Sequence, residues 1–185
     1  MERFRFRPTP LTGLTVIERT CIEDSRGFLS RFFCQETMSR LGMKPIQQIN
    51  HTLTRKAGAI RGMHFQHPPA AEIKIVSCLQ GRILDVAVDL RAGSPTFLQW
   101  FSAELSRENQ YSLFIPEGFA HGFQTLTKNC ELLYLHTVNY SPTHEAGLNP
   151  LDPLLAITWP LDVSEISARD QAHPMLDSNF KGIEV

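Results

Sequence analysis

The sequence lacks the features that mark membrane, secreted or nucleic-acid-binding proteins. Its 185 residues contain no signal-peptide block and no apolar run approaching the roughly 18 residues that span a bilayer. The 18 Lys and Arg residues nearly balance the 19 Asp and Glu residues, so no net field attracts nucleic acid. We therefore expect a cytoplasmic, water-soluble protein that binds neither a membrane nor nucleic acid.

Cysteine is scarce and scattered. The four cysteines, Cys21, Cys34, Cys78 and Cys130, include no C-x-x-C pair, so neither a disulfide framework nor a cysteine zinc site is indicated. Internal repeats, low-complexity tracts and Ser/Gly-rich linkers are also missing. With 42% hydrophobic and 20% charged residues, the composition predicts one domain over residues 1–185.

The sequence does contain short stretches of alternating apolar residues, interrupted by Gly, Pro and Asn, which are typical of strands in a sandwich or barrel. The clearest strands, 73–79 and 83–90, flank Gly81, whose freedom to adopt a positive φ suits a hairpin. One face of the second strand is apolar. Its other face includes Asp85 and Asp89, as expected for a cavity wall. The pattern predicts a mostly β protein.

The remaining elements are predicted from the same signals. Strands are expected at 97–105, 110–115, 123–126 and 132–138, and short helices at 35–42 and 164–170. Ser164 or Ser167 would cap the second helix. The proline-rich stretch 149–153 predicts a turn that leaves the barrel, and residues 161–185 are expected to form an appendage packed on the domain.

Two segments, 60–67 and 115–123, each place histidine beside glycine-permitted turns. In the second, Pro116, Gly118 and His121 form the spacing Pro-x-Gly-x-x-His, the second half of a cupin signature. In a cupin, a double-sheet β-barrel holds a pocket between its two sheets. The pattern therefore favours a pocket protein, although so short a match is by itself weakly specific.

Four residues from the same region could hold a metal ion. His64, His67, Glu72 and His121 supply the imidazole and carboxylate groups that suit a non-haem iron or a similar ion. The spacing argues against such a site, because residues three apart on a strand point to opposite faces. We therefore expect no metal.

Eight segments follow one another along residues 10–182 in a specific order. They are 24–28, 48–51, 60–66, 74–76, 85–91, 94–97, 115–123 and 140–142. In this combination the chain resembles the dTDP-4-dehydrorhamnose 3,5-epimerase family, the RmlC-like cupins. The resemblance implies a cupin-type double-sheet β-barrel, or jelly roll. It also implies a metal-free and cofactor-free epimerase that acts on a nucleotide-linked 4-keto-6-deoxy sugar in deoxysugar biosynthesis.

Epimerisation beside a ketone needs a base, a donor for the enolate oxygen, and an acid on the opposite face of the ring. The resemblance assigns these roles to four residues. The base is His64, the carboxylate that orients it is Asp170, the cation near the keto oxygen is Lys74, and the acid is Tyr134. A free imidazole side chain titrates near neutrality, with a pKa of about 6.5 in water, which suits the role of base.

The resemblance also implies six substrate-binding residues. Two arginines would contact the diphosphate, two polar residues the nucleotide, an aromatic ring the base or sugar, and a second histidine the sugar and enolate. They are Arg61 and Arg26, Gln48 and Asn50, Phe28, and His121, in that order. Arg26 would act from the neighbouring subunit of a homodimer, which the N-terminal segment 1–35 helps to form.

The chain departs from the family pattern at several positions. Arg31 stands in place of a common acidic residue, residues 50–54 lack a common arginine that Arg55 could replace, and residues 145–153 lack a common Arg and Trp. These departures suggest a subfamily that acts on a related sugar. The nucleotide stays open between dTDP, CDP and GDP, and the inversion stays open between carbon 3, carbon 5 and both. Two alternatives stay open, a non-catalytic sugar-binding cupin and a metal-dependent cupin enzyme.

Overall fold

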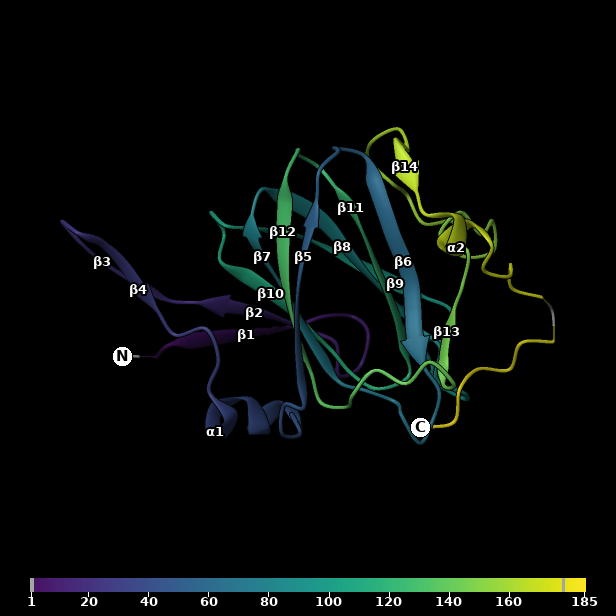
Figure 1. The fold of residues 1–185 in the computed structure, drawn as a ribbon. Helices are drawn as coiled ribbons and strands as arrows, with labels where there is room; N and C mark the ends of the chain where they lie inside the picture. Colours follow the sequence, from purple (N-terminus) through teal and green to yellow (C-terminus); the bar gives the residue numbers. More distant parts are fainter. Residues whose placement is uncertain (1, 178) are drawn as a thin grey trace.

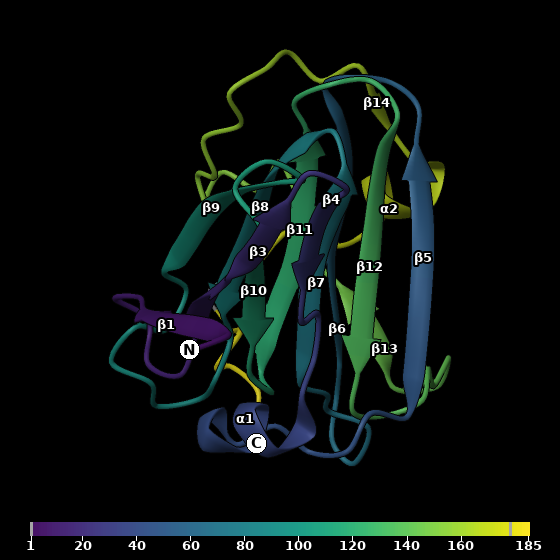
Figure 2. The ribbon, with the colours of Figure 1, turned by 90° about the vertical axis from the view of Figure 1, so that its left-hand side faces the viewer.

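The computed structural model describes residues 2–177 and 179–185, which fold mainly into strands that form two facing sheets (Figures 1 and 2). The strands are β1 (Phe4–Pro8), β2 (Thr15–Arg19), β3 (Cys21–Asp24), β4 (Gly27–Ser30), β5 (Gln48–Thr54), β6 (Ala59–Gln66), β7 (Lys74–Gln80), β8 (Arg82–Asp89), β9 (Trp100–Ser106), β10 (Tyr111–Ile115), β11 (Phe119–Thr125), β12 (Cys130–His136), β13 (Glu145–Gly147) and β14 (Glu165–Ile166). The short helices are α1 (Gln35–Met38), the 3-10 helix η1 (Ser39–Leu41) and α2 (Ala168–Gln171).

The first sheet has the strand order β1-β2-β10-β7-β12-β5, and the second has the order β13-β6-β11-β8-β9, with β14 added parallel to β6. From β6 to β12 the chain changes sheet at every connection except that between β8 and β9. Apolar side chains from both sheets fill the space between them. Its largest members include Leu11, Leu14, Ile83, Leu105, Leu113 and Phe123. The predicted cupin-type double-sheet barrel is confirmed.

The predicted hairpin between residues 73–79 and 83–90 is wrong, although both strands exist. Strand β7 pairs with β10 and β12, whereas β8 pairs with β9 and β11 in the other sheet. Gly81 has a φ of 76°, and a Cβ there would lie 2.6 Å from Thr127 Oγ1 and 2.8 Å from Cys130 Sγ. A glycine turn suits a crossing between sheets as well as a hairpin. Pairing with non-adjacent strands lets both sheets bury their inner faces.

The other predicted strands correspond to β9, β10, β11 and β12, with ends that differ by a few residues. The first predicted helix is found as α1 followed by η1, and it ends at Gly42, whose φ is 81°. The second helix was predicted at 164–170 but begins only at Ala168, because the preceding residues pair with β6 as β14. Ser167 caps it as predicted, accepting a hydrogen bond from the backbone N–H of Asp170.

Two further apolar layers cover the outer faces of the sheets. The helices α1 and η1 cover the first sheet, where Met38 packs with Phe4, Ile17 and Phe114. The C-terminal segment covers the second sheet. There it contributes Leu148, Leu155, Leu176 and Ile183, which pack on Val86, Val88 and Leu90 of β8 and its continuation. This C-terminal layer carries α2 to the barrel (Figure 1).

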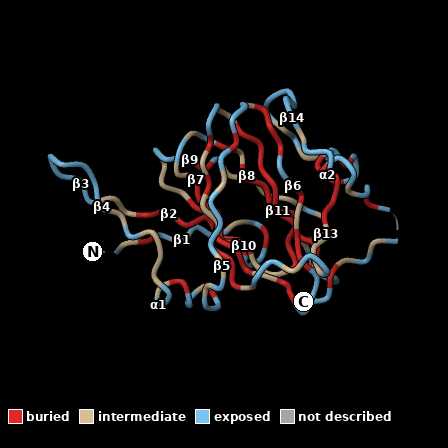
Figure 3. Tube along the Cα trace, viewed as in Figure 1, coloured by how far each residue is buried: buried red, intermediate tan, exposed pale blue. Residues whose placement is uncertain are grey.

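Strands β3 and β4 form a separate two-stranded sheet that projects away from the barrel (Figure 1). Its residues are mostly exposed, in contrast to the buried strands of the barrel (Figure 3). Among the described residues, no helix combines the length and apolar character needed to cross a membrane.

Strands β6 and β11 approach closely at two glycines. Gly62 has a φ of 122°, and a Cβ at that position would lie only 2.5 Å from the Cα of Gly122. The close approach is therefore possible only because neither strand has a side chain there. It places His64 directly opposite His121 in the register of the two strands.

We predict that Gly62→Ala destabilises the protein by at least about 2 kcal/mol, because it adds both a backbone clash and an unfavourable φ. Gly93→Ala is the matched control, since Gly93 also has a positive φ (71°) but a Cβ there meets nothing within 4 Å. Urea unfolding should show a loss of about 1 kcal/mol for the control. Equal losses in the two variants would show that the close approach is not what requires glycine.

Candidate active site

A cavity of about 770 Å³ opens between the two sheets. Eight of the ten predicted site residues line it, namely Gln48, Asn50, Arg61, His64, Lys74, His121, Tyr134 and Asp170. The two others lie elsewhere in the chain. Arg26 and Phe28 are on the projecting hairpin, where Arg26 forms an ion pair with Asp24 at 2.6 Å. The barrel thus gathers residues that are more than one hundred positions apart in the sequence, such as His64 and Asp170.

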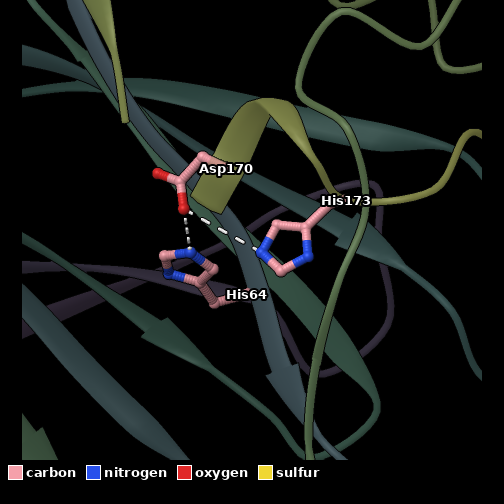
Figure 4. Close-up of side chains that lie close together, drawn as sticks. All are labelled: His64, Asp170 and His173. Atoms are coloured by element: carbon pink, nitrogen blue, oxygen red, sulfur yellow. Dashed lines mark hydrogen bonds and ion pairs between the residues drawn. The ribbon is translucent and has the colours of Figure 1, made fainter. Parts of the chain in front are cut away.

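His64 on β6 is held by Asp170 on α2 (Figure 4). Its Nε2 donates a hydrogen bond to Asp170 Oδ1 at 2.8 Å, and Asp170 Oδ2 accepts the backbone N–H of Gly62 at 3.1 Å. Burial alone would raise the pKa of Asp170, but these hydrogen bonds hold it below its usual value. Because Nε2 donates to an ionised carboxylate, the lone pair of a neutral His64 lies on Nδ1.

A second histidine–carboxylate pair lies beside the first. His121 Nε2 is 2.7 Å from Asp85 Oδ1, and the carboxylate of Asp85 is fully buried inside the barrel. Burial raises the pKa of Asp85, and its Oδ2 has no hydrogen-bond partner among the described residues. Asp85 belongs to the mixed face of β8, the face that the sequence predicted to line a cavity wall.

Lys74 enters the cavity from the first sheet and is almost fully buried. Its Nζ lies 2.9 Å from Glu72 Oε1, and Glu72 Oε2 lies 2.7 Å from His136 Nδ1. Burial opposes ionisation of Glu72, but the charge of Lys74 and the hydrogen bond from His136 lower its pKa to about 2. The carboxylate fixes a charged ammonium group inside the cavity.

Tyr134 also belongs to the first sheet, on β12. Its ring stacks on His136 with a centroid distance of 6.0 Å and meets His121 edge-on at 6.1 Å. Burial raises the pKa of Tyr134, so its hydroxyl keeps its proton at neutral pH. The tyrosine therefore faces His64 and His121 from the opposite sheet.

Polar side chains of the edge strand β5 continue the cavity wall beyond these rings. Gln48 Nε2 donates to Asn50 Oδ1 at 3.1 Å, and Asn50 Nδ2 lies 3.4 Å from His136 Nε2. Across from them, Arg61 Nε donates to Thr54 Oγ1 at 3.0 Å, which leaves part of the guanidinium for an incoming anion.

The cavity is also lined by residues that were not predicted as site residues, among them Arg169, Glu145 and Tyr140. Arg169 forms an ion pair with Glu145, and the hydroxyl of Tyr140 donates to Glu145 Oε2 at 2.6 Å. Arg169 immediately precedes Asp170, and Tyr140 begins one of the segments that carried the family resemblance. Both positions were therefore close to a recognised signal.

The alternation of strands gives a further signal. Glu72 is two residues before Lys74, and His136 is two residues after Tyr134, so each pair points to one side of its chain segment. From the sequence, Glu72 was predicted only as a possible metal ligand, and His136 was not predicted as a site residue. Of the four residues weighed as a metal set, three line the cavity, but His67 is exposed and lies outside it.

A family model described as dTDP-4-dehydrorhamnose 3,5-epimerase matches residues 8–178. The chain is 41% identical over 172 residues to the dTDP-4-dehydrorhamnose 3,5-epimerase of Salmonella typhimurium, which covers 91% of this chain and 93% of that protein. It is 36% identical over 169 residues to the dTDP-4-dehydrorhamnose 3-epimerase of Streptomyces niveus, covering 90% of this chain and 81% of that protein.

A solved structure gives the same result at the level of the fold. The dTDP-6-deoxy-D-glucose-3,5-epimerase of Legionella pneumophila, in complex with dTDP-4-keto-L-rhamnose, matches with a TM-score of 0.91 and 36% identity. The match covers 98% of this chain and 99% of that one.

The pKa of Glu72 predicts how stability depends on pH. Its folded pKa of about 2 lies below the usual 4.5, so the stabilisation is present above pH 4.5 and is lost as the pH falls toward 2. As the pH falls from 4.5 to 2, the free energy of unfolding of the wild type should therefore decrease. We expect this decrease to be about 3 kcal/mol larger in the wild type than in Glu72→Gln.

The control is Glu104→Gln, since Glu104 is half-exposed and pairs with Arg82 at 3.6 Å. Denaturant unfolding from pH 2 to 7 should give the same pH profile for this variant as for the wild type. If Glu72→Gln also followed the wild-type profile, ionisation of Glu72 beside Lys74 and His136 would contribute nothing to the pH dependence of stability.

Proposed function

Because this chain belongs to the dTDP-4-dehydrorhamnose 3,5-epimerase family, we propose that it inverts carbons 3 and 5 of a dTDP-linked 4-keto-6-deoxy sugar. It is an epimerase of nucleotide-linked deoxysugars. The observation that carries the proposal for this cavity is a histidine–aspartate pair on one sheet, facing a buried lysine and tyrosine on the other. The four groups are His64, Asp170, Lys74 and Tyr134.

In the proposed first step, Nδ1 of His64 removes the hydrogen from the carbon beside the ketone. The C–H bond breaks, its electron pair forms the enolate, and the proton joins Nδ1. The imidazolium that results is stabilised by the ionised Asp170, which already accepts Nε2–H at 2.8 Å. Asp170 also fixes the ring, so that Nδ1 points away from the tail and toward the cavity.

Lys74 stabilises the enolate. Its ammonium is buried and held by Glu72, so it acts in a region where water screens charge poorly. A preorganised donor of this kind contributes about 3 to 4 kcal/mol to lowering a barrier. Glu72 holds the ammonium of Lys74 in position, ready for the charge that develops on the enolate oxygen.

Tyr134 returns a proton from the other face of the ring. Its raised pKa keeps the hydroxyl protonated, and its position on the first sheet sets it across the cavity from His64. Removal of a proton on one face and delivery on the other inverts the carbon. His121, held by Asp85, lies between the two groups and contacts the sugar and the enolate in this proposal.

The nucleotide diphosphate would extend toward the outer part of the cavity. Arg61 and Arg169 offer guanidinium groups to the diphosphate, a geometry that suits bidentate contacts. Gln48 and Asn50 also line the cavity and would donate to the nucleotide. The relatives named above carry dTDP in their names, which supports dTDP over the CDP or GDP that the sequence departures had left open.

We also propose that two copies of the chain form a dimer in which each hairpin completes the other copy's cavity. Among the described residues, β3 and β4 pair with no other strand, and an isolated two-stranded hairpin is marginally stable in water. It exposes Phe28 (51%) and Leu29 (66%), while the edge strand β5 exposes Ile49 (59%) beside the cavity. The partner's hairpin would bring Arg26 and Phe28 to the nucleotide.

Proton NMR in deuterated water tests the chemistry. We predict exchange at carbons 3 and 5 of dTDP-4-keto-6-deoxyglucose with the wild type, slowed about 1000-fold in His64→Asn, because the base is lost. His67→Asn is the control, since His67 is exposed outside the cavity. The CDP- and GDP-linked sugars should react far more slowly. If His64→Asn exchanged these hydrogens at the wild-type rate, another group would have to be the base.

Mixing of two inactive variants tests the dimer. Light scattering should give twice the chain mass of 21.0 kDa. The first variant, His64→Asn, lacks the base, and the second, Arg26→Ala with Phe28→Ala, lacks the hairpin contacts. After subunit exchange, a mixed dimer has one intact site, so about a quarter of wild-type activity should return. No recovery would mean that the hairpin acts on its own chain or not at all.

A further inference from the structure

His173 lies beside the reactive pair, directly after α2 (Figure 4). Its Nε2 is 3.9 Å from Asp170 Oδ1, and its ring meets the ring of His64 edge-on at a centroid distance of 5.6 Å. One ligand atom from each of His64, Asp170 and His173 lies within 4.8 Å of the other two. Neither the family resemblance nor the proposed mechanism uses His173.

The Nε2 of His173 is buried and has no hydrogen-bond partner among the described residues. A buried nitrogen without a partner is unfavourable unless something occupies it in solution. The backbone also makes room for this ring, because a Cβ at Gly147 would clash with the same Nε2. The nitrogen therefore lies beside the edge of β13, 3.9 Å from Asp170 Oδ1, and accepts no hydrogen bond from a described residue.

Two imidazoles and a carboxylate make up a ligand set that suits zinc and similar divalent ions. In a tetrahedral zinc site, with bonds of about 2.0 to 2.2 Å, neighbouring ligand atoms are about 3.3 to 3.5 Å apart. The observed separations of 2.8 Å and 3.9 Å from Asp170 Oδ1 lie on either side of that value. Small side-chain rotations would bring all three ligands to one ion, and the fourth position would face the cavity that His64 and Asp170 line.

We propose that His64, Asp170 and His173 bind a divalent cation of the zinc class, and that the bound ion switches the epimerase off. The binding site follows from the geometry alone, whereas the inhibition rests on the proposed role of His64 as the base. Magnesium and calcium are not expected to bind, since both prefer oxygen ligands.

The inhibition follows from the two nitrogens of His64. Without the ion, Nε2 carries the proton that Asp170 accepts, and Nδ1 has the free lone pair. A cation bound at Nε2 takes that lone pair, so the single proton of the neutral imidazole has to move to Nδ1. The nitrogen that faces the substrate is then protonated and cannot accept the substrate's proton.

Calorimetry of the metal-depleted protein tests the binding site without any substrate. We expect one zinc ion per chain in the wild type, at least tenfold weaker binding in both His173→Phe and His173→Asn, and no magnesium binding. Two variants are used because the larger ring of Phe could disturb the packing against Gly147. His67→Phe is the control, since it removes an exposed histidine outside the cluster and should bind zinc as the wild type does.

Exchange assays at fixed free zinc test the inhibition, with nitrilotriacetate as the metal buffer because the substrate's diphosphate also binds zinc. Each protein is compared with its own rate in EDTA. Zinc should slow the wild type and His67→Phe at least tenfold, and the His173 variants much less. Equal zinc affinity or equal inhibition in the wild type and the His173 variants would overturn the proposal. If the wild type catalysed no exchange even in EDTA, that result would instead contradict the proposed function.

Discussion

The two hydrogen bonds of the Asp170 carboxylate connect the C-terminal segment to the reactive strand of the barrel. One oxygen accepts from His64 and the other from the backbone of Gly62, while the side chain is only 6% exposed. Both hydrogen bonds break if the tail leaves β6, so His64 and the backbone N–H of Gly62 would lose their partner and the protein would be destabilised. The packing of the tail therefore sets the orientation of His64, because the tail carries the carboxylate that holds the imidazole ring. The tail also covers the second sheet.

Carboxylates also hold the other basic groups in the cavity. His121 pairs with Asp85 and Lys74 pairs with Glu72, so each histidine or lysine that would face the sugar ring has its own carboxylate. Such pairs keep the basic groups in fixed positions before the substrate arrives. A fixed electrostatic environment needs little rearrangement when charge moves to the enolate, and this lowers the barrier. The carboxylates are also what allows charged groups to be buried between two apolar sheets.

The sequence predicted the positions of most strands, because alternation along a strand is a local property. It failed on the partner of β7, since the turn at Gly81 is compatible with a hairpin and with a crossing between sheets. The residues of the site divide in the same way, into those that a sequence pattern predicts and those that meet only through the packing of the fold. His64, Lys74, Tyr134 and Asp170 were predicted through the family resemblance and meet in one cavity. The contact between His173 and His64 depends on how the tail packs, and no local pattern encodes it.

The arrangement of the two sheets bears on how many carbons are inverted. In a sugar chair with the glucose configuration, the hydrogens on carbons 3 and 5 are both axial and point to the same face. His64 lies on the second sheet and Tyr134 on the first, so in the proposed mechanism a sugar ring held with this face toward His64 presents both hydrogens to the base. One base and one acid can then serve both carbons after a small shift of the ring, once His64 has released the first proton to solvent and Tyr134 has regained one. Inversion at a single carbon would need that shift to be blocked, and no second set of catalytic groups is required for inversion at both.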